Sequence, residues 1–386
     1  MDAARLKESW NAVAQHGDQV PLHFYATLFL MYPETRQLFP VSLAAQRDRL
    51  VGALGQIVSD VDNLDALVPF LQHLGRDHRK FQVVTDHYPA VGAALLATLA
   101  HFLGPRWTDE LARSWAEAYD VIASVMTGAA EDASRTEPPW WDAEVVSREL
   151  RTFDVAVLTI RPSHHYPYRP GQSVAVETPV RPRLWRYYSP ANSPRVDNTL
   201  ELHVRQVPGG LVSSALVQLV QVGDVLRLGA PVGARLTLDA SQGRDLLLIA
   251  GGTGLAPLRA LIEQVAAEGG RRRAVLVLGA RTARELYDMR AVLELRDRLP
   301  WLTVLPVLSD DPLRGGPQAI AVDAARRFEP WHEYEVYACG SAEMVHGTVK
   351  SVVDAGVAPD RIHYEEFQSH QYPPAVIGAA NVREHA

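Results

Sequence analysis

The spacing of apolar residues changes twice along this chain, and the three spacings constrain its fold more than any other feature. Up to about residue 132, side chains that would face a core recur every three or four positions, as in the series Leu43, Gln46, Leu50, Leu54, Ile57 and Val61. That period matches the helical turn and buries one face of each helix. Proline and glycine separate these stretches, so we predict a purely helical domain of about six to eight helices at 1–132.

A short segment rich in proline and charge ends the helical pattern. In EDASRTEPPWW, which begins at Glu131, two prolines cannot continue a helix, and we place a linker at 133–142. Beyond it the period falls to two, with apolar and polar residues alternating through Leu200, Glu201, Leu202, His203, Val204 and Arg205. This alternation predicts half-buried antiparallel strands, and the frequent Pro/Gly turns predict a small β-barrel at 143–240.

From about residue 243, strands alternate with helices. Helical stretches follow the apolar runs DLLLIA, AVLVLGAR, LTVLPVLS and YEVYACG. Continuous apolar runs belong to strands that are covered on both faces, so we predict a doubly wound parallel sheet at 241–386. The fold class expected for the whole chain is therefore multidomain: all-α, then antiparallel β-barrel, then α/β.

Composition narrows the classes of function. The net charge of −7 gives no electrostatic reason to expect nucleic acid or anionic lipid as a partner. The single cysteine, Cys339, excludes an internal disulfide and any zinc or iron–sulfur site held by four cysteines of this chain. Because we find neither a signal peptide nor about 18 consecutive apolar residues, we expect a cytoplasmic protein without integral membrane contact. The oligomeric state is open, with a monomer as the working expectation.

Three motifs in the second half carry groups suited to nucleotide cofactors. GGTGLAPL, from Gly251 to Leu258, follows a predicted strand and opens a helix, where glycines let the backbone approach a pyrophosphate. RYYS, from Arg186 to Ser189, combines a cation for phosphate oxygens with an aromatic ring and a hydroxyl for a flavin. GGLVS, at 209–213, offers backbone N–H groups to a second phosphate. Taken singly, each motif also fits a structural role: a tight turn, a strand end, or a loop entering a helix.

In this order and spacing, the motifs resemble those of the ferredoxin–NADP reductase superfamily from about residue 145 to the end, with PGQ at 170–172 and ACGS at 338–341 completing the match. The resemblance implies an FAD-binding barrel followed by a domain that binds NADH or NADPH. On the FAD side it implies Tyr168, Gln172, Arg186, Tyr188, Ser189, Gly209, Gly210, Val212, Ser213, Glu365 and Phe367. On the nicotinamide side it implies Gly251, Gly252, Thr253, Gly254, Pro257, Cys339 and Gly340. One departure is Ala234 in APVGARL, where relatives carry an aromatic residue.

The choice between NADH and NADPH is open at this level. Arg281 and Arg284 follow a predicted strand of the sheet. They either meet the 2′-phosphate of NADPH or are solvated loop charges.

In the helical segment, a few polar residues interrupt the apolar series. His78 ends the series Leu64, Leu67, Leu71 and Leu74, and is either a hydrogen-bonded core residue or an iron ligand through neutral imidazole. Gln46 lies within an apolar series, where it needs a buried partner or a ligand. Tyr25 is either an ordinary amphipathic tyrosine or part of the same pocket.

Five segments together resemble the globin domain of flavohaemoglobins over roughly residues 5–128: HFYATLF, YPETRQLF, AQRDRL, DHRKFQV and HYPAVGAALLATL. The resemblance implies haem b with His78 as the proximal iron ligand. It makes Tyr25, Gln46 and Leu50 the distal pocket. It also places Phe39 on the porphyrin and Tyr88 in support of the proximal histidine.

The last globin helix departs from the family pattern. Relatives carry a glutamate there that pairs with the proximal histidine, whereas this chain has Ala130, followed by Glu131. Either the helix shifts by one residue or the carboxylate is missing. Because a carboxylate makes imidazole more electron-donating, the strength of any peroxidase-like reaction depends on which alternative holds.

The flavohaemoglobin resemblance implies an oxidoreductase that passes electrons from NAD(P)H through FAD to haem and converts NO and O2 to nitrate. One alternative is a haem oxidase, peroxidase or nitrogen-oxide enzyme that uses the same reductase. Another is a sensor that binds O2 or NO, although a sensor needs no continuous supply of hydride.

Overall fold

A computed structural model describes residues 2–239, 243–270, 272–310, 325–328 and 330–367. Contacts divide these residues into two compact units, 2–140 and 141–367, and each is considered by itself. The β-barrel and the α/β domain predicted from the sequence are therefore packed into a single unit.

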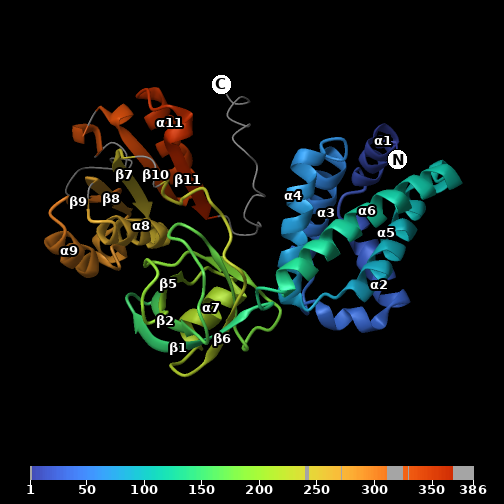
Figure 1. The fold of residues 1–386 in the computed structure, drawn as a ribbon, viewed down its shortest axis with the longest axis horizontal. Helices are drawn as coiled ribbons and strands as arrows, with labels where there is room; N and C mark the ends of the chain where they lie inside the picture. Colours follow the sequence, from blue (N-terminus) through green and yellow to red (C-terminus); the bar gives the residue numbers. More distant parts are fainter. Residues whose placement is uncertain (1, 240–242, 271, 311–324, 329, 368–386) are drawn as a thin grey trace. The chain divides into compact units, whose positions relative to one another are not determined.

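The first unit is entirely helical in its described residues (Figure 1). Its α-helices are α1 (Ala3–Ala14), α2 (Gln19–Met31), α3 (Ala44–Ser59), α4 (Leu64–His78), α5 (Tyr88–Leu103) and α6 (Asp109–Ser134). Short 3₁₀ turns lie between them at Pro33–Leu38, Arg79–Phe81, Thr85–His87 and Gly104–Arg106. Because α6 ends at Ser134 and the next strand begins at Trp141, the irregular segment spans 135–140, which is shorter than the linker predicted at 133–142.

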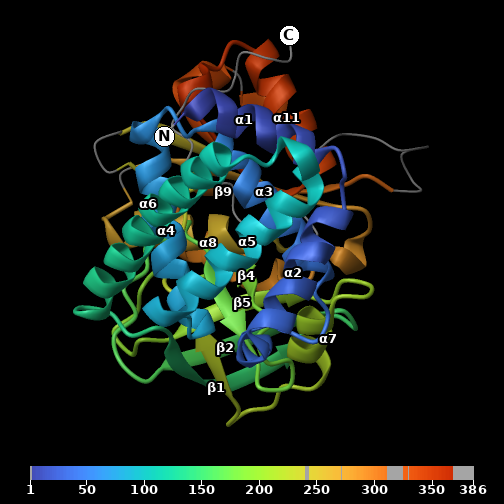
Figure 2. The ribbon, with the colours of Figure 1, turned by 90° about the vertical axis from the view of Figure 1, so that its right-hand side faces the viewer.

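Helix α5 lies between α2 and α6 and forms the centre of the helical core (Figure 2). Its residues Ala94 and Leu99 are completely buried. By length and composition alone, Thr85–Arg106 is the one helix among the described residues that is apolar enough to cross a membrane. Core helices of globular domains meet the same criteria, so this observation is weak evidence of membrane contact.

The second unit begins with a six-stranded antiparallel sheet that curls into a nearly closed barrel. Its elements are β1 (Trp141–Leu150), β2 (Val155–Pro162), β3 (Val174–Glu177), β4 (Arg186–Tyr188), β5 (Leu200–Arg205), α7 (Leu211–Gln218) and β6 (Val225–Leu228). The strand order is β4-β3-β6-β1-β2-β5, and a bridge between Pro190 and Leu202 brings the two edges together. The segment with a period of two therefore forms the predicted barrel, and Leu200, Leu202 and Val204 lie in its core.

The rest of the second unit is a five-stranded parallel sheet with helices on both faces. Its elements are β7 (Asp245–Gly251), α8 (Leu255–Ala267), β8 (Ala274–Ala280), α9 (Met289–Arg298), β9 (Leu302–Leu308), β10 (Tyr334–Ser341), α11 (Ala342–Asp354) and β11 (Ile362–Phe367). Short 3₁₀ turns occur at Gly252–Gly254, Ala283–Glu285, Ala325–Phe328, Trp331–Glu333 and Pro359–Arg361. The order β11-β10-β7-β8-β9 confirms the doubly wound sheet.

Alternate residues of this sheet face opposite layers. Leu246 and Leu248 pack toward α8 and α9, whereas Leu247 and Ile249 pack toward α11. The first of these clusters also contains Val155 from the barrel strand β2. A shared apolar core is one reason why the barrel and the sheet form one compact unit.

Candidate functional site

The proximal candidate, His78, closes helix α4 with its ring held by the main chain. Its Nδ1 lies 2.7 Å from the carbonyl oxygen of Leu74, one turn earlier. Because a carbonyl oxygen only accepts, Nδ1 carries the proton and Nε2 keeps its lone pair. Burial lowers the pKa of His78, which favours the neutral ring. A neutral imidazole with an unprotonated Nε2 is the form that ligates iron, so this residue fits a haem.

Tyr88, at the start of α5, packs in the same region as the proximal histidine's helix. It is partly buried against the apolar cluster that contains Leu74 and Met126. Its main-chain oxygen accepts a hydrogen bond of 2.6 Å from the hydroxyl of Tyr119. Burial raises the pKa of Tyr88 to about 12, so its hydroxyl stays protonated at neutral pH.

Helix α6 carries no carboxylate to the proximal ring. Glu131 is exposed, and its main-chain oxygen accepts a hydrogen bond from Ser134. Among the described residues, no carboxylate hydrogen-bonds to His78. The structure therefore does not support the one-residue shift that would bring Glu131 to the histidine. With alanine at position 130, the hydrogen-bond partner of the His78 ring is the main-chain oxygen of Leu74.

Sequence reasoning missed a pair of buried charges beside the iron-ligand candidate. Lys80 Nζ is paired with Asp77 Oδ1, and the two side chains are only 4% and 7% exposed. Burial by itself would raise the pKa of Asp77, but Lys80 lowers it. Asp77 and Lys80 are three positions apart, a spacing at which opposite charges on a helix can pair, and this was the signal in the sequence. These charges lie next to His78 in a low-dielectric interior, where electrostatic effects are stronger than in water.

The distal candidates Tyr25 and Gln46 lie within hydrogen-bond distance of each other. The contact is made by the main chain of Gln46 and not by its side chain. The hydroxyl of Tyr25 lies 3.3 Å from the main-chain oxygen of Gln46, while the side-chain Oε1 of Gln46 accepts from Arg49 at 3.2 Å. The rings of Tyr25 and Phe39 meet edge to face with centroids 5.4 Å apart. Leu50 packs against the same core. Burial raises the pKa of Tyr25, so its hydroxyl is a proton donor at neutral pH.

In the barrel, the first three residues of the RYYS motif form β4 and pair with β3, and Ser189 follows the strand. Tyr188 is opposite Val174 and Arg186 opposite Val176. Tyr188 packs on the barrel core, and Arg186 donates through Nη1 to the carbonyl oxygen of Trp185 at 2.8 Å. The strand therefore presents a cation, a ring and a hydroxyl in a fixed order, which suits a flavin.

Three side-chain oxygens in a row connect the barrel to β11, an edge strand of the parallel sheet. Ser189 Oγ lies 3.2 Å from Ser173 Oγ, which lies 3.4 Å from Glu365 Oε1 on β11. Burial raises the pKa of Glu365, and Cys339 is its register partner on β10. Sequence reasoning missed Ser173, although it directly follows the PGQ motif. Phe367, at the end of β11, is 44% exposed.

The GGLVS loop is braced by its own serine. Ser213 Oγ accepts from the N–H of Val207 at 3.1 Å and approaches the carbonyl oxygen of Gly210 at 3.3 Å. A Cβ on Gly210 would lie 2.5 Å from that hydroxyl, and Gly209 has φ of +74°. The positive φ favours glycine at position 209, while Val212 anchors the loop in the barrel core.

Two further FAD candidates support loops of the barrel. Tyr168 is buried and donates to the main-chain oxygen of Asn192 at 2.9 Å. Gln172 donates through Nε2 to the carbonyl oxygen of Gly233 at 3.1 Å. The next residue, Ala234, where the family resemblance predicts an aromatic side chain, is exposed.

The glycine-rich turn packs directly on the strand that carries Cys339. A Cβ on Gly254 would lie 2.1 Å from the carbonyl oxygen of Cys339, and a Cβ on Gly340 would lie 3.1 Å from the Cα of Gly251. Helix α8 starts immediately after this turn, with Pro257 in its first turn. Close backbone approach at the beginning of a long helix fits a dinucleotide pyrophosphate.

Arg281 is already engaged by a carboxylate. Glu285 accepts from its main-chain N–H at 3.1 Å and from its Nη2 at 2.7 Å. The side chain of Arg281 is 71% exposed and that of Glu285 is 26% exposed. The residue considered for a 2′-phosphate therefore has an acidic neighbour.

Comparisons with known proteins place both units in one family. Three family models match: Globin at residues 22–126, Oxidoreductase FAD-binding domain at 140–235 and Oxidoreductase NAD-binding domain at 248–350. The flavohemoprotein of Chromobacterium violaceum is 31% identical and spans 95% of this chain and 97% of its own length. The chain belongs to the flavohaemoprotein family. The flavohemoprotein of Bordetella parapertussis is 29% identical over 94% of this chain and 97% of its own.

Solved structures show the same fold. The flavohemoglobin of Malassezia yamatoensis, crystallised with FAD and heme, has a TM-score of 0.74 at 20% identity and covers 95% of this chain and 98% of its own. The FAD/NAD-binding domain of a nitric oxide dioxygenase from Vibrio cholerae has a TM-score of 0.52 at 22% identity and covers 59% of this chain and 98% of its own. The predicted fold class and family are confirmed. The protein is an oxidoreductase whose cofactors are haem, FAD and a nicotinamide dinucleotide.

Proposed function

We propose that this flavohaemoprotein is an NAD(P)H-dependent nitric oxide dioxygenase that converts NO and O2 to nitrate. The observation that carries the proposal is the buried hydroxyl of Tyr25, in a globin whose His78 is ready to bind iron. The single proton of this hydroxyl is donated to the main-chain oxygen of Gln46, and in this proposal it turns from that acceptor to a ligand bound at the iron. A hydrogen-bond donor shielded from water stabilises negative charge that develops on a bound ligand. The same activity is named for the Vibrio cholerae protein with this reductase fold.

When bound, the nicotinamide supplies a hydride, FAD divides it into single electrons, and haem iron provides the centre at which O2 and NO combine. One NO, one O2 and one electron make one nitrate, so one hydride serves two turnovers. In this scheme, Ser173, Ser189 and Glu365 form a polar path beside the flavin. The proposal places the reaction in the cytoplasm, where the lone thiol of Cys339 stays reduced.

The residues assigned through the family resemblance keep those roles in this proposal. His78 holds the iron, and Tyr25, Gln46 and Leu50 line its distal side. The RYYS strand and the GGLVS loop hold FAD, and the GGTG turn with Cys339 and Gly340 receives the nicotinamide. Each role is a hypothesis that substitution tests.

The proximal side of the globin argues against a dedicated peroxidase. Strong O–O activation is favoured when a carboxylate increases electron donation by the axial ligand. Here the partner of His78 is the carbonyl of Leu74. A sensor is disfavoured for another reason, because a complete reductase would have no use without turnover.

The test is turnover measured with an NO electrode in air-saturated buffer with excess NADH, with nitrate counted against NO consumed. We expect one nitrate for each NO. The matched control is His78→Ala, which should lose NO consumption yet still reduce ferricyanide through the flavin. If wild-type protein consumes NADH but forms little nitrate, a haem oxidase or another nitrogen-oxide reaction replaces the proposal.

A further inference from the structure

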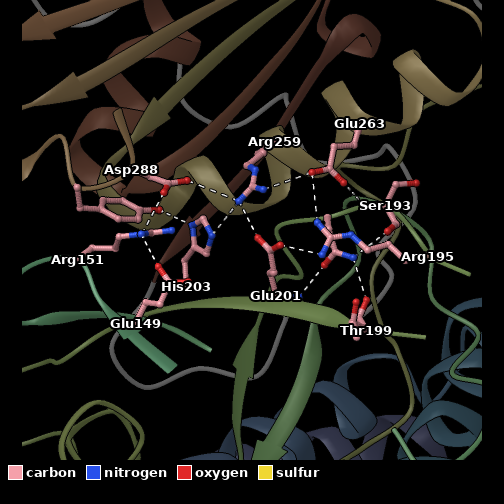
Figure 3. A network of polar contacts seen from close by, with 12 residues as sticks. Glu149, Arg151, Ser193, Arg195, Thr199, Glu201, His203, Arg259, Glu263 and Asp288 are labelled. Atoms are coloured by element: carbon pink, nitrogen blue, oxygen red, sulfur yellow. Dashed lines mark hydrogen bonds and ion pairs between the residues drawn. The ribbon is translucent and has the colours of Figure 1, made fainter. Parts of the chain in front are cut away.

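The polar face of strand β5 is covered, not solvated. Glu201, His203 and Arg205 alternate with apolar core residues, a pattern typical of a strand with one face in water. In the structure, however, His203 is 4% exposed and the side chain of Glu201 is 16% exposed. The residues that cover them come from α8 and from the segment just before α9 (Figure 3). This face is therefore an internal interface between the barrel and the parallel sheet's helices.

Arg259 of α8 is the central contact of this interface. Its Nη1 lies 2.8 Å from Glu201 Oε2 and 3.6 Å from Asp288 Oδ2. The same nitrogen lies 3.4 Å from Nε2 of His203. Its Nη2 lies 3.4 Å from Glu263, one helical turn further on. Burial opposes the charge of Arg259, yet the surrounding carboxylates raise its pKa.

Each carboxylate that contacts this central arginine also contacts an arginine of the barrel (Figure 3). Arg195 lies 2.8 Å from Glu201 and 3.6 Å from Glu263. Arg151 lies 3.3 Å from Asp288. The result is a continuous network of alternating charges that spans the barrel and the nucleotide-binding part of the unit.

A neutral pair completes the network. His203 Nδ1 lies 2.7 Å from the hydroxyl of Tyr287, the neighbour of Asp288. Burial holds the pKa of His203 well below its usual value, and Arg259 lowers it further. The His203 ring is therefore uncharged at neutral pH and hydrogen-bonds between Tyr287 and Arg259.

Such a network specifies geometry more than it adds stability. Removing charges from water costs free energy, and buried ion pairs often contribute no more than apolar side chains of equal volume. Charge-assisted hydrogen bonds are directional, however, and a displaced partner would leave a buried charge unpaired. An apolar contact tolerates sliding, whereas paired charges favour the arrangement in which every charge keeps its partner.

The network joins elements that lead to both predicted cofactor sites. Arg259 is in the first turns of α8, the helix that starts after the GGTG turn. At the end of β5, Arg205 approaches the turn itself, since a Cβ on Gly252 would lie 3.5 Å from its Nη1. Beyond Arg205 the chain enters the GGLVS loop, where the flavin phosphates are expected. One strand thus connects the flavin loop with the nicotinamide turn.

We propose that Arg259 is a positioning residue for hydride transfer: through Glu201 and Asp288 it sets the glycine-rich turn in register with the flavin barrel. The inference rests on the proposed step from NAD(P)H to FAD. Hydride transfer requires the donor and acceptor atoms in near contact, and a misplacement of about 1 Å can cost about a hundredfold in rate. Arg259 itself touches neither cofactor in this scheme and acts through the position of the turn.

The test compares Arg259→Met with wild type in the full-length holoprotein. Anaerobic stopped-flow mixing with NADH gives the rate of flavin reduction and the long-wavelength absorbance from stacking of nicotinamide on flavin. We expect a loss of about tenfold to a hundredfold in the limiting rate, with a weaker stacking band. FAD content and photochemical reduction of the flavin should be unchanged. Arg259→Lys should recover part of both signals.

The control is Arg290→Met on α9, which removes a guanidinium from a surface pair with Glu294 whose side chains are 94% and 60% exposed. It should match wild type in every measurement. If Arg259→Met lowers the melting temperature but keeps the limiting rate and the stacking band, the network is only structural and the proposal is wrong. If Arg259→Met loses FAD, Glu201→Gln is used instead and must show the same rate loss. A wild-type protein that neither NADH nor NADPH can reduce would instead refute the proposed function.

Discussion

The Nδ1–H of His78 donates to the carbonyl oxygen of Leu74 across 2.7 Å, within one turn of α4. This partner is neutral, whereas a carboxylate would draw the proton more strongly and make the imidazole a better electron donor. In the proposed role of iron ligand, His78 would therefore be a moderate electron donor, suited to binding O2 more than to cleaving an O–O bond.

This geometry leads to an expectation for peroxide. Wild-type protein should react slowly with hydrogen peroxide, and its ferrous form should show a low iron–histidine stretching frequency by resonance Raman spectroscopy. Ala130→Glu, which introduces the glutamate expected from the family resemblance, should raise the frequency and speed the peroxide reaction by about tenfold. A wild-type frequency as high as that of the Ala130→Glu variant would contradict the account, since it would show strong donation without the carboxylate.

On the distal side, Tyr25→Phe should slow NO consumption and speed O2 release. Loss of a preorganised donor of this kind commonly costs about 2–4 kcal/mol of transition-state stabilisation. Ferricyanide reduction through the flavin should stay near wild type, because only the haem step uses this hydroxyl. Stopped-flow O2 release and NO-electrode turnover measure the two effects, and a variant that matches wild type in both would refute the distal assignment.

Gln46→Ala should have a smaller effect than Tyr25→Phe. The Tyr25 hydroxyl bonds to the main-chain oxygen of Gln46, which alanine retains, while the lost side chain is bonded to Arg49. The same O2-release and turnover assays compare the two variants. Equal losses in both would mean that the glutamine side chain, and not its backbone, positions the hydroxyl.

In the barrel, Arg186→Ala and Ser213→Ala should both lower FAD occupancy, the first more severely. The arginine variant loses charge-assisted bonds to phosphate, each contributing about 1.5–3 kcal/mol. The serine variant loses the bonds to Val207 and Gly210 that shape the loop. Flavin absorbance per haem after gel filtration reports occupancy. Full retention of FAD in both variants would overturn the barrel assignment, whereas haem content should not change.

For nicotinamide choice, we expect a modest preference for NADH, because Glu285 engages Arg281 where a 2′-phosphate would have to approach. Because the guanidinium of Arg281 is solvated, the pair is a weak one and the preference should be only a few-fold. Glu285→Ala should move the ratio of kcat/KM values toward NADPH. Glu294→Ala, which frees Arg290 on the surface, serves as the control. A Glu285→Ala ratio equal to wild type would show that these residues do not read the ribose.

Much of the architecture was predictable because periodicity is a local property. The period of 3.6 indicated the helices, and the period of two indicated the barrel strands. The continuous apolar runs indicated strands β7 to β10 of the parallel sheet. The glycines at 251–254 were interpreted as room for a pyrophosphate, and only the structure showed that Gly254 also packs against the main chain of Cys339. In the helical unit, the apolar series on α4 pointed to His78 as a buried ring.

What only the tertiary structure decided are the partners of polar groups. Sequence alone determined that Glu201 and His203 share a face of β5, but a polar face looks the same whether water or another domain covers it. The fold brought Arg259 to that face, Ser173 to Glu365, and the main chain of Gln46 to Tyr25. The physical reason is that hydrophobic burial follows local patterns, whereas a hydrogen bond or ion pair needs two groups placed within a few tenths of an ångström by distant segments.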